Sequence, residues 1–139
     1  GPADAFIAST MFLHDAAQQQ STGRGPNRLE GKGTAQLRQI VNRMVETIET
    51  PLSLEELAQQ SGLTRRTLDR LFQAELAMSP GRYYQLMRLT HARELSTSTD
   101  YDLREIALRC GYADASALGK AFRKAFGHPI RKSRGSRPH

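Results

Sequence analysis

The sequence predicts an all-α protein with about seven helices, and three observations lead to this fold class. Apolar residues recur at spacings of three and four, no segment alternates with the period of a strand, and capping residues or glycines bound the apolar runs. The 139 residues suffice for one domain or two small ones. No apolar run approaches the roughly 20 residues of a membrane span, so we expect no transmembrane segment.

The first 33 residues are expected to form a helix followed by a linker. Residues 3–17 lack proline and glycine and are rich in large apolar side chains, which predicts a helix. Residues 18–33 contain four glycines and a proline among polar residues, which is typical of a flexible linker. We interpret the initial Gly-Pro as a tag scar and the helix as the last element of a missing upstream domain.

Residues 34–139 are expected to form the main domain, and its first unit covers about 34–78. Thr34 is the expected N-cap of a helix that reaches about Glu49, because apolar residues repeat at helical spacing after it. Two shorter helices follow. Ser53 caps the first, with Glu56 in the capping-box position, and Thr64 caps the second.

A long connecting helix is expected at about 79–97, followed by a second unit at about 98–134. Ser79-Pro80 is a cap followed by a proline in the first turn, which is a typical helix start. Asp102 caps a short helix that ends at Gly111, and Asp114 caps another that runs to about Phe126.

The two units repeat the same pattern. Five positions match at an offset of 49 and three more at an offset of 50, so one residue is inserted in the second turn. The matched pairs are Leu54/Leu103, Leu57/Ile106, Ala58/Ala107, Gly62/Gly111, Leu63/Tyr112, Thr64/Asp114, Leu68/Leu118 and Phe72/Phe122. Each copy is a short helix, a turn with glycine and a capped second helix, which is the helix-turn-helix plan. A duplicated helical scaffold without DNA-binding function is the alternative.

The basic residues are concentrated outside the first segment. Residues 1–33 hold three basic and three acidic side chains, whereas residues 34–139 hold 17 basic and 11 acidic ones. From Ala115 onward there are seven basic residues and no acidic one. Such an excess indicates either a polyanionic partner or a solvated basic face.

Residues 34–134 resemble the DNA-binding domain of the AraC/XylS family of bacterial transcription regulators. The resemblance is carried by SPGRYYQLMRLTHAREL in the first half and IALRCGYADASALGKAFRKAFG in the second. Three departures stand out. Ala77 replaces a usual glycine, Ala117-Leu118 replaces an aromatic pair, and Ser96 replaces a common leucine. We therefore expect slight strain at Ala77 and a looser end of the connecting helix at Ser96.

The resemblance implies two recognition helices that enter successive major grooves, about 34 Å or ~10 bp apart. In the first, it assigns base reading to Arg66, Asp69 and Arg70, with the arginines suited to guanine and the carboxylate to cytosine. The alternative for Asp69 is that it only pairs with a neighbouring arginine and orients it. In the second, it assigns base reading to Ser116 and Lys120, and contacts to thymine methyl groups to Ala115 or Ala117.

Further residues are expected to bind phosphates, with a solvated tail as the alternative for those nearest the C-terminus. They are Thr64, Arg65, Thr67, Arg82, Arg123, Lys124 and Arg131. Reading of flanking bases is the alternative for Arg65 and Thr67. Lys132, Arg134 and Arg137 follow Arg131 in the basic tail, with the same two alternatives of phosphate binding and solvation.

No constellation typical of an enzyme is present, so we expect no catalytic activity, cofactor or metal. The four histidines are scattered, no phosphate-binding glycine loop occurs, and the single cysteine, Cys110, fits a buried small residue in a reducing cytosol. The alternative function is that of a basic helical protein-interaction module without sequence-specific DNA binding.

The resemblance also implies partners for a cytoplasmic, nucleoid-associated bacterial protein. Double-stranded DNA is the first, and RNA polymerase is the second. An effector small molecule is expected only through the missing upstream domain, because MFLHDAA resembles the last helix of the amidotransferase-like sensing domain of some members.

Overall fold

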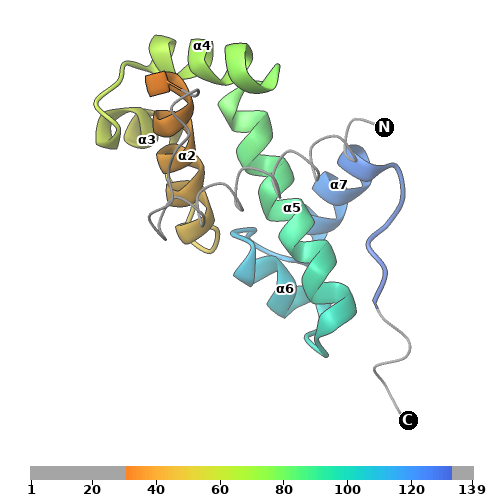
Figure 1. Ribbon diagram of the computed structural model, residues 1–139. Helices are drawn as coiled ribbons and strands as arrows, with labels where there is room; N and C mark the ends of the chain where they lie inside the picture. The colour runs from red at the N-terminus through yellow and green to blue at the C-terminus, as the bar shows by residue number, and fades with distance from the viewer. Residues whose placement is uncertain (1–30, 133–139) are drawn as a thin grey trace. The chain divides into compact units, whose positions relative to one another are not determined.

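The computed structural model describes residues 31–132, and this part contains six helices and no strand (Figure 1). In chain order they are α2 (Gly31–Glu46), α3 (Leu54–Gln60), α4 (Arg65–Leu76), α5 (Pro80–Ser98), α6 (Leu103–Arg109) and α7 (Ala115–Phe126). The all-α prediction is confirmed. The helix predicted at 3–17 and most of the linker predicted at 18–33 lie outside the described residues, as do residues 133–139.

Five of the predicted helix caps are confirmed by their hydrogen bonds. The backbone N–H groups of Glu56, Thr67, Arg82, Glu105 and Ala117 donate to the side chains of Ser53, Thr64, Ser79, Asp102 and Asp114, respectively. Ser53 and Glu56 form the complete capping box, because the Ser53 N–H also donates to the Glu56 carboxylate at 2.9 Å. Each cap satisfies an N–H that would otherwise lack a partner inside the helix.

The predicted bounds of the first helix of the main domain were wrong. Helix α2 begins at Gly31 and ends at Glu46, so Thr34 lies inside the helix and is not its cap. The Thr34 hydroxyl instead lies 3.5 Å from Glu75 Oε1 of α4, and Gly33 lies beside Leu71 and Glu75. The first turn of α2 contains Gly31 and Gly33, and glycine has a low helix propensity. Packing of this turn on α4 therefore stabilises it.

The described chain divides into two compact units. One comprises residues 31–47 and 52–84, and the other comprises residues 48–51 and 85–132. Helix α5 passes from the first unit to the second after Tyr84.

Each unit has a core of its own. In the first, the ring of Phe72 meets the ring of Tyr83 edge-on at 5.7 Å, and both side chains are fully buried. The other buried residues there include Leu37, Ile40, Met44, Leu57 and Leu68. The second core consists of Leu89, Ala92, Ile106, Ala107, Cys110, Leu118 and Phe122. Burial of these apolar side chains fixes the inward side of each helix and leaves its other side to solvent.

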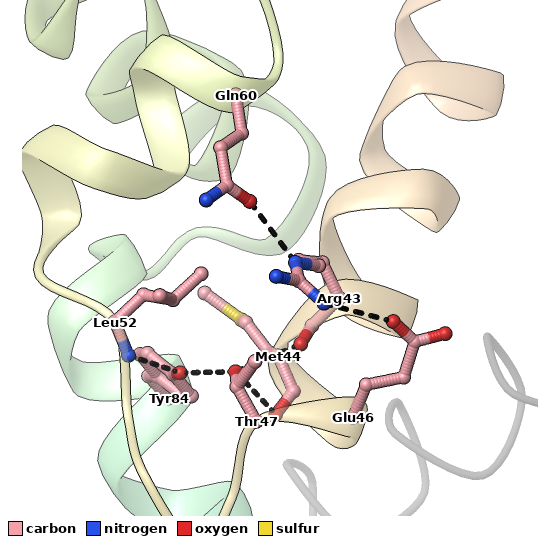
Figure 2. Close-up of polar contacts among 7 residues, drawn as sticks. All are labelled: Arg43, Met44, Glu46, Thr47, Leu52, Gln60 and Tyr84. Carbon is pink, nitrogen blue, oxygen red and sulfur yellow. Dashed lines mark hydrogen bonds and ion pairs between the residues drawn. The ribbon is translucent and has the colours of Figure 1, made fainter.

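A polar cluster fixes the chain in the first unit where α2 ends and α3 approaches (Figure 2). The Tyr84 hydroxyl accepts from the Leu52 N–H at 2.9 Å and lies 2.6 Å from Thr47 Oγ1. Thr47 donates its own proton to the Arg43 carbonyl at 2.8 Å, so Tyr84 is the donor to Thr47. Arg43 also donates to Gln60 of α3 at 3.0 Å. These bonds satisfy the last turn of α2 and hold it beside α3.

The two helix-turn-helix corners have the same backbone geometry. Gly62 and Gly111 have φ values of +73° and +84°. The Leu63 N–H donates to the Ala58 carbonyl, and the Tyr112 N–H donates to the Ala107 carbonyl, both at 2.8 Å. Each of these bonds closes a Schellman turn. The repeat deduced from the sequence is therefore a structural repeat, with glycine where a left-handed conformation is required.

No helix in residues 31–132 combines the length and the apolar character that crossing a membrane requires.

Candidate nucleic-acid interface

Helix α4 separates its buried side from a charged, exposed side. Leu68 and Phe72 are fully buried, whereas Arg66 and Arg70 are exposed and Asp69 is half-buried. Neither Arg66 nor Arg70 makes a hydrogen bond or ion pair with another described residue. Both guanidinium groups therefore keep all five donors available for a ligand.

Arg65 lies in a small ionic network with two carboxylates. Its guanidinium is 2.8 Å from Glu55 Oε2 on α3 and 3.3 Å from Asp69 Oδ1 on α4. The three side chains are 43–73% exposed, so the network contributes little to stability. It does orient Arg65, and it shows the pairing of Asp69 with a neighbouring arginine that the sequence left as an alternative.

Thr64 and Thr67 lie at the first turn of α4. The Thr64 hydroxyl accepts from the Thr67 N–H at 3.1 Å and donates to the Thr67 hydroxyl at 3.0 Å. Thr64 is thus occupied as a cap, while Thr67 keeps its hydroxyl proton for another acceptor.

Helix α7 presents a surface of small side chains with one projecting cation. Ser116 and Lys120 are exposed, and Ala115 and Ala117 are half-buried. A Cβ added at Gly119 would meet no atom within 4 Å, so this position faces open space. The inward side is anchored by Leu118 and Phe122. Such a surface allows close approach of a ligand's backbone or methyl groups.

The remaining basic candidates are exposed cations without partners among residues 31–132. They are Arg82 at the start of α5, Arg123 and Lys124 at the end of α7, and Arg131 after it. An anion that binds them does not have to break an existing ion pair.

Lys132 was assigned by the sequence analysis to the basic tail, and this was wrong. Its ammonium group is half-buried and donates to the carbonyls of Tyr101 and Thr99, the latter at 3.3 Å. The cation thus satisfies two carbonyls in the loop that follows α5. The signal for this role is absent from the sequence, because the partners lie about 31 to 33 residues away.

Cys110 is a buried residue, as predicted. Its side chain is fully buried in the second core, and burial raises its pKa from 9.0 to about 12. The thiol is therefore neutral and unreactive near neutral pH. Across residues 31–132, no three His, Cys, Asp or Glu side chains gather as a metal site requires.

Comparison with known proteins supplies relatives along most of the chain. A family model described as a helix-turn-helix domain matches residues 57–136. The HTH-type transcriptional regulator GbdR of Pseudomonas aeruginosa is 36% identical over 132 residues, which cover 94% of this chain and 36% of the relative. ArgR of the same organism is 36% identical over 111 residues, which cover 80% of this chain and 33% of that relative. The chain thus spans about a third of the length of these curated relatives.

Solved structures agree with these relatives in both fold and sequence. An AraC-type transcriptional regulator from Chromobacterium violaceum has 33% identity and a TM-score of 0.68, covering 76% of this chain and 96% of that one. The DNA-binding domain of AdpA, solved with a target DNA, has 30% identity and a TM-score of 0.64. The match covers 68% of this chain and 85% of that one. With its duplicated corners, its two exposed second helices and these relatives, the chain belongs to the AraC-type helix-turn-helix family.

Proposed function

We propose that this chain is the DNA-binding part of a bacterial transcription regulator and that it reads double-stranded DNA with α4 and α7. The observation that carries the proposal is the position of Arg66, Arg70 and Lys120. They are exposed, have no partner among the described residues, and lie opposite the buried side of the second helix of each repeat. The similarity to the AdpA domain, which was solved with DNA, supports it.

In the first half-site, the bases are read by Arg66, Asp69 and Arg70. A guanidinium with free donors can grip O6 and N7 of guanine with two hydrogen bonds. Asp69 accepts from N4 of cytosine. Its bond to Arg65 uses only one carboxylate oxygen, Oδ1, so Oδ2 remains available.

In the second half-site, Ser116 and Lys120 read bases, and Ala115 or Ala117 contacts thymine methyl groups. The short side chains of α7 bring its backbone close to the duplex. We therefore expect less hydrogen-bond discrimination here than at α4, and more dependence on DNA shape.

Phosphate contacts fix the register of both helices on the duplex without reading sequence. We assign them to Thr64, Arg65, Thr67, Arg82, Arg123, Lys124 and Arg131. Because the sequences of α4 and α7 differ, the two half-sites differ, and the target need not be a palindrome. We place the half-sites in successive major grooves, about 10 bp apart.

The other functional proposals follow from family membership. The protein acts without catalysis, in the bacterial cytoplasm, and contacts RNA polymerase through a surface away from DNA. Any effector acts through an upstream domain. The chain spans only about a third of its curated relatives, which leaves room in them for such a domain.

In vitro selection from random duplexes tests the function. We expect one motif with two unlike halves, about 10 bp between centres. Binding that shows no base preference would support the basic protein-interaction module instead.

Single substitutions then test the reading residues on the selected duplex. Arg66→Ala or Arg70→Ala should cost about 1–3 kcal/mol of binding and relax the preference at one base position. Arg123→Ala is the matched control, because loss of a phosphate contact weakens binding to every sequence alike. If Arg66→Ala and Arg70→Ala weaken binding equally on specific and on random DNA, these arginines do not read bases.

A further inference from the structure

The turn of the second helix-turn-helix unit is held by a side chain from outside that motif. Arg88, on α5, donates from Nε to the Cys110 carbonyl and from a terminal nitrogen to the Gly111 carbonyl, both at 2.8 Å. Its guanidinium also lies 4.3 Å from the centre of the Tyr112 ring. One planar group thus contacts three consecutive residues of the turn between α6 and α7.

The first unit has a counterpart in the same place. Gln36, on α2, donates from Nε2 to the Ser61 carbonyl at 3.2 Å. Ser61 and Cys110 are the C-cap residues of α3 and α6, so both bonds reach the equivalent carbonyl.

The two helices that carry these side chains match at a constant offset of 52. Gln36 corresponds to Arg88, and the buried positions Leu37/Leu89, Ile40/Ala92 and Met44/Ser96 correspond as well. The structural repeat therefore includes a third helix. Each unit begins with a long helix, and one side chain of that helix donates hydrogen bonds to the turn of the helix-turn-helix that follows. We call these side chains, Gln36 and Arg88, the latches.

The two latches differ in strength. Gln36 makes one bond between neutral groups, whereas Arg88 makes two charge-assisted bonds in a fixed fork and stacks on an aromatic face. A cation at a helix C-terminus also interacts favourably with the helix dipole.

The Arg88 latch controls a turn that leads directly into α7. Tyr112 is two residues before the cap Asp114, so the orientation of the turn sets the direction in which α7 begins. Gly111 leaves no room for adjustment. A Cβ there would come within 2.7 Å of the Ile48 carbonyl oxygen and of Pro51.

We propose that Arg88 is a positioning residue for the second reading helix, that Gln36 is its weaker counterpart for the first, and that the two reading helices are therefore held with unequal rigidity. The roles of Arg88 and Gln36 in holding the turns concern the protein alone, whereas their effect on DNA reading rests on the proposed function. In this proposal Arg88 makes no contact with DNA. It acts through the backbone of residues 110–112.

Arg88→Gln tests the proposal by giving the second turn the side chain of the first. Hydrogen exchange is measured on the folded chain, with circular dichroism as the check of fold. We expect exchange at the amides of Tyr112 and the first turn of α7 to be about tenfold faster, while those of Leu63 and α4 keep their rates. Gln36→Ala is the matched control, and it should accelerate exchange at Leu63 by a smaller factor and leave Tyr112 unchanged.

The second readout is base preference on the selected duplex. Arg88→Gln should relax the preference at the half-site read by α7 and leave the half-site read by α4 unchanged. Arg88→Lys should not restore it, because an ammonium group cannot reproduce the fork to two carbonyls. If Arg88→Gln does not fold, Arg88→Lys serves in both measurements with the same expected directions.

Unchanged exchange at Tyr112 in a folded Arg88 variant would overturn the proposal, as would an equal loss of preference at both half-sites. The proposed function fails separately. If the unsubstituted chain selects no motif, DNA reading is wrong, and the exchange rates still decide whether Arg88 holds the turn.

Discussion

Ala77 adopts a backbone conformation that ordinarily belongs to glycine. It ends α4 with φ +54° and ψ +39°, and within residues 31–132 it is the one non-glycine residue with positive φ. The expectation of strain at this position came from the resemblance alone, and the dihedral angles bear it out. In this region Cβ crowds the backbone, at a cost of roughly 1–2 kcal/mol.

Ala77→Gly should therefore raise the free energy of unfolding. The relief of strain exceeds the added entropy of the unfolded chain, and we expect a net gain of about 0.5–1 kcal/mol. Urea unfolding measures it. Ala74→Gly is the control, because Ala74 is exposed in the last turn of α4 with helical backbone, where glycine should lower the free energy of unfolding by up to about 1 kcal/mol. A loss of stability in both variants would contradict this explanation.

Gly62 and Gly111 should respond differently to the same substitution, although both have positive φ. A Cβ at Gly62 meets nothing within 4 Å, whereas one at Gly111 comes within 2.7 Å of Ile48 O and Pro51 Cγ. Gly62→Ala should cost about 1 kcal/mol from backbone strain alone, and Gly111→Ala about 3 kcal/mol because overpacking is added. Chemical denaturation of the two variants gives the comparison. Equal losses would show that the close approach at Gly111 relaxes freely.

Cys110 should make stability depend on pH above neutrality. Its pKa in the folded state is raised to about 12 from 9.0, so the unfolded chain loses the thiol proton first as pH rises. Its contribution to stability is present below pH 9 and is lost as pH rises toward 12. The difference in unfolding free energy between the unsubstituted chain and Cys110→Ala should therefore shrink by about 1 kcal/mol from pH 9 to pH 10. A difference that stays constant would mean that the thiol titrates normally.

At the scale of elements, local sequence signals account for most helix ends. Ser53, Thr64, Asp102 and Asp114 were read as caps from residue type and spacing, and each accepts the expected hydrogen bond. These signals work because a cap and the N–H it satisfies are only three residues apart.

Asp114 offers a test of one such cap. Asp114→Ala removes the acceptor for the Ala117 N–H, a bond of 2.8 Å, and should destabilise the second unit by about 1 kcal/mol. Asp114→Asn keeps an acceptor and should recover most of the loss. Thermal unfolding of the three proteins measures this, and equal destabilisation by Asn and Ala would show that charge rather than capping matters.

The end of α5 departs from expectation. We expected Ser96, in place of a common leucine, to loosen it, yet the helix continues to Ser98 and Ser96 is buried. The Ser96 hydroxyl donates to the Arg93 carbonyl at 2.7 Å, so the buried polar group is satisfied. Hydroxyls of the next three residues donate to carbonyls of Glu94 and Leu95 in the same way. Leu95 of the same turn packs against the second core, so apolar packing also reaches this end of the helix.

At the scale of the whole molecule, the net charge of +6 dominates the expected interaction with DNA. Five of the proposed phosphate contacts are cations: Arg65, Arg82, Arg123, Lys124 and Arg131. At about 0.9 per neutralised phosphate, the logarithm of the binding constant should fall with the logarithm of salt concentration with a slope of about −4.5.

Salt titrations with the selected duplex check this slope. Arg123→Ala should reduce its magnitude by about 0.9. Arg43→Ala should leave it unchanged, because Arg43 lies on α2, outside the proposed phosphate contacts, where it binds Gln60 and Glu46 (Figure 2). A slope near zero for the unsubstituted chain would argue against phosphate binding altogether.

The sequence by itself determined the all-α class, the six helices of the described part, the N-caps of every one of them except α2, and the duplicated corner with its two glycines. All of these depend on neighbours within about five residues or on a repeat visible along the chain. The tertiary structure decided the start of α2 at Gly31, the use of Lys132 on the Tyr101 carbonyl, and the latches of Gln36 and Arg88. Those contacts join residues at least 22 positions apart, so they form only when burial of the cores brings the helices together.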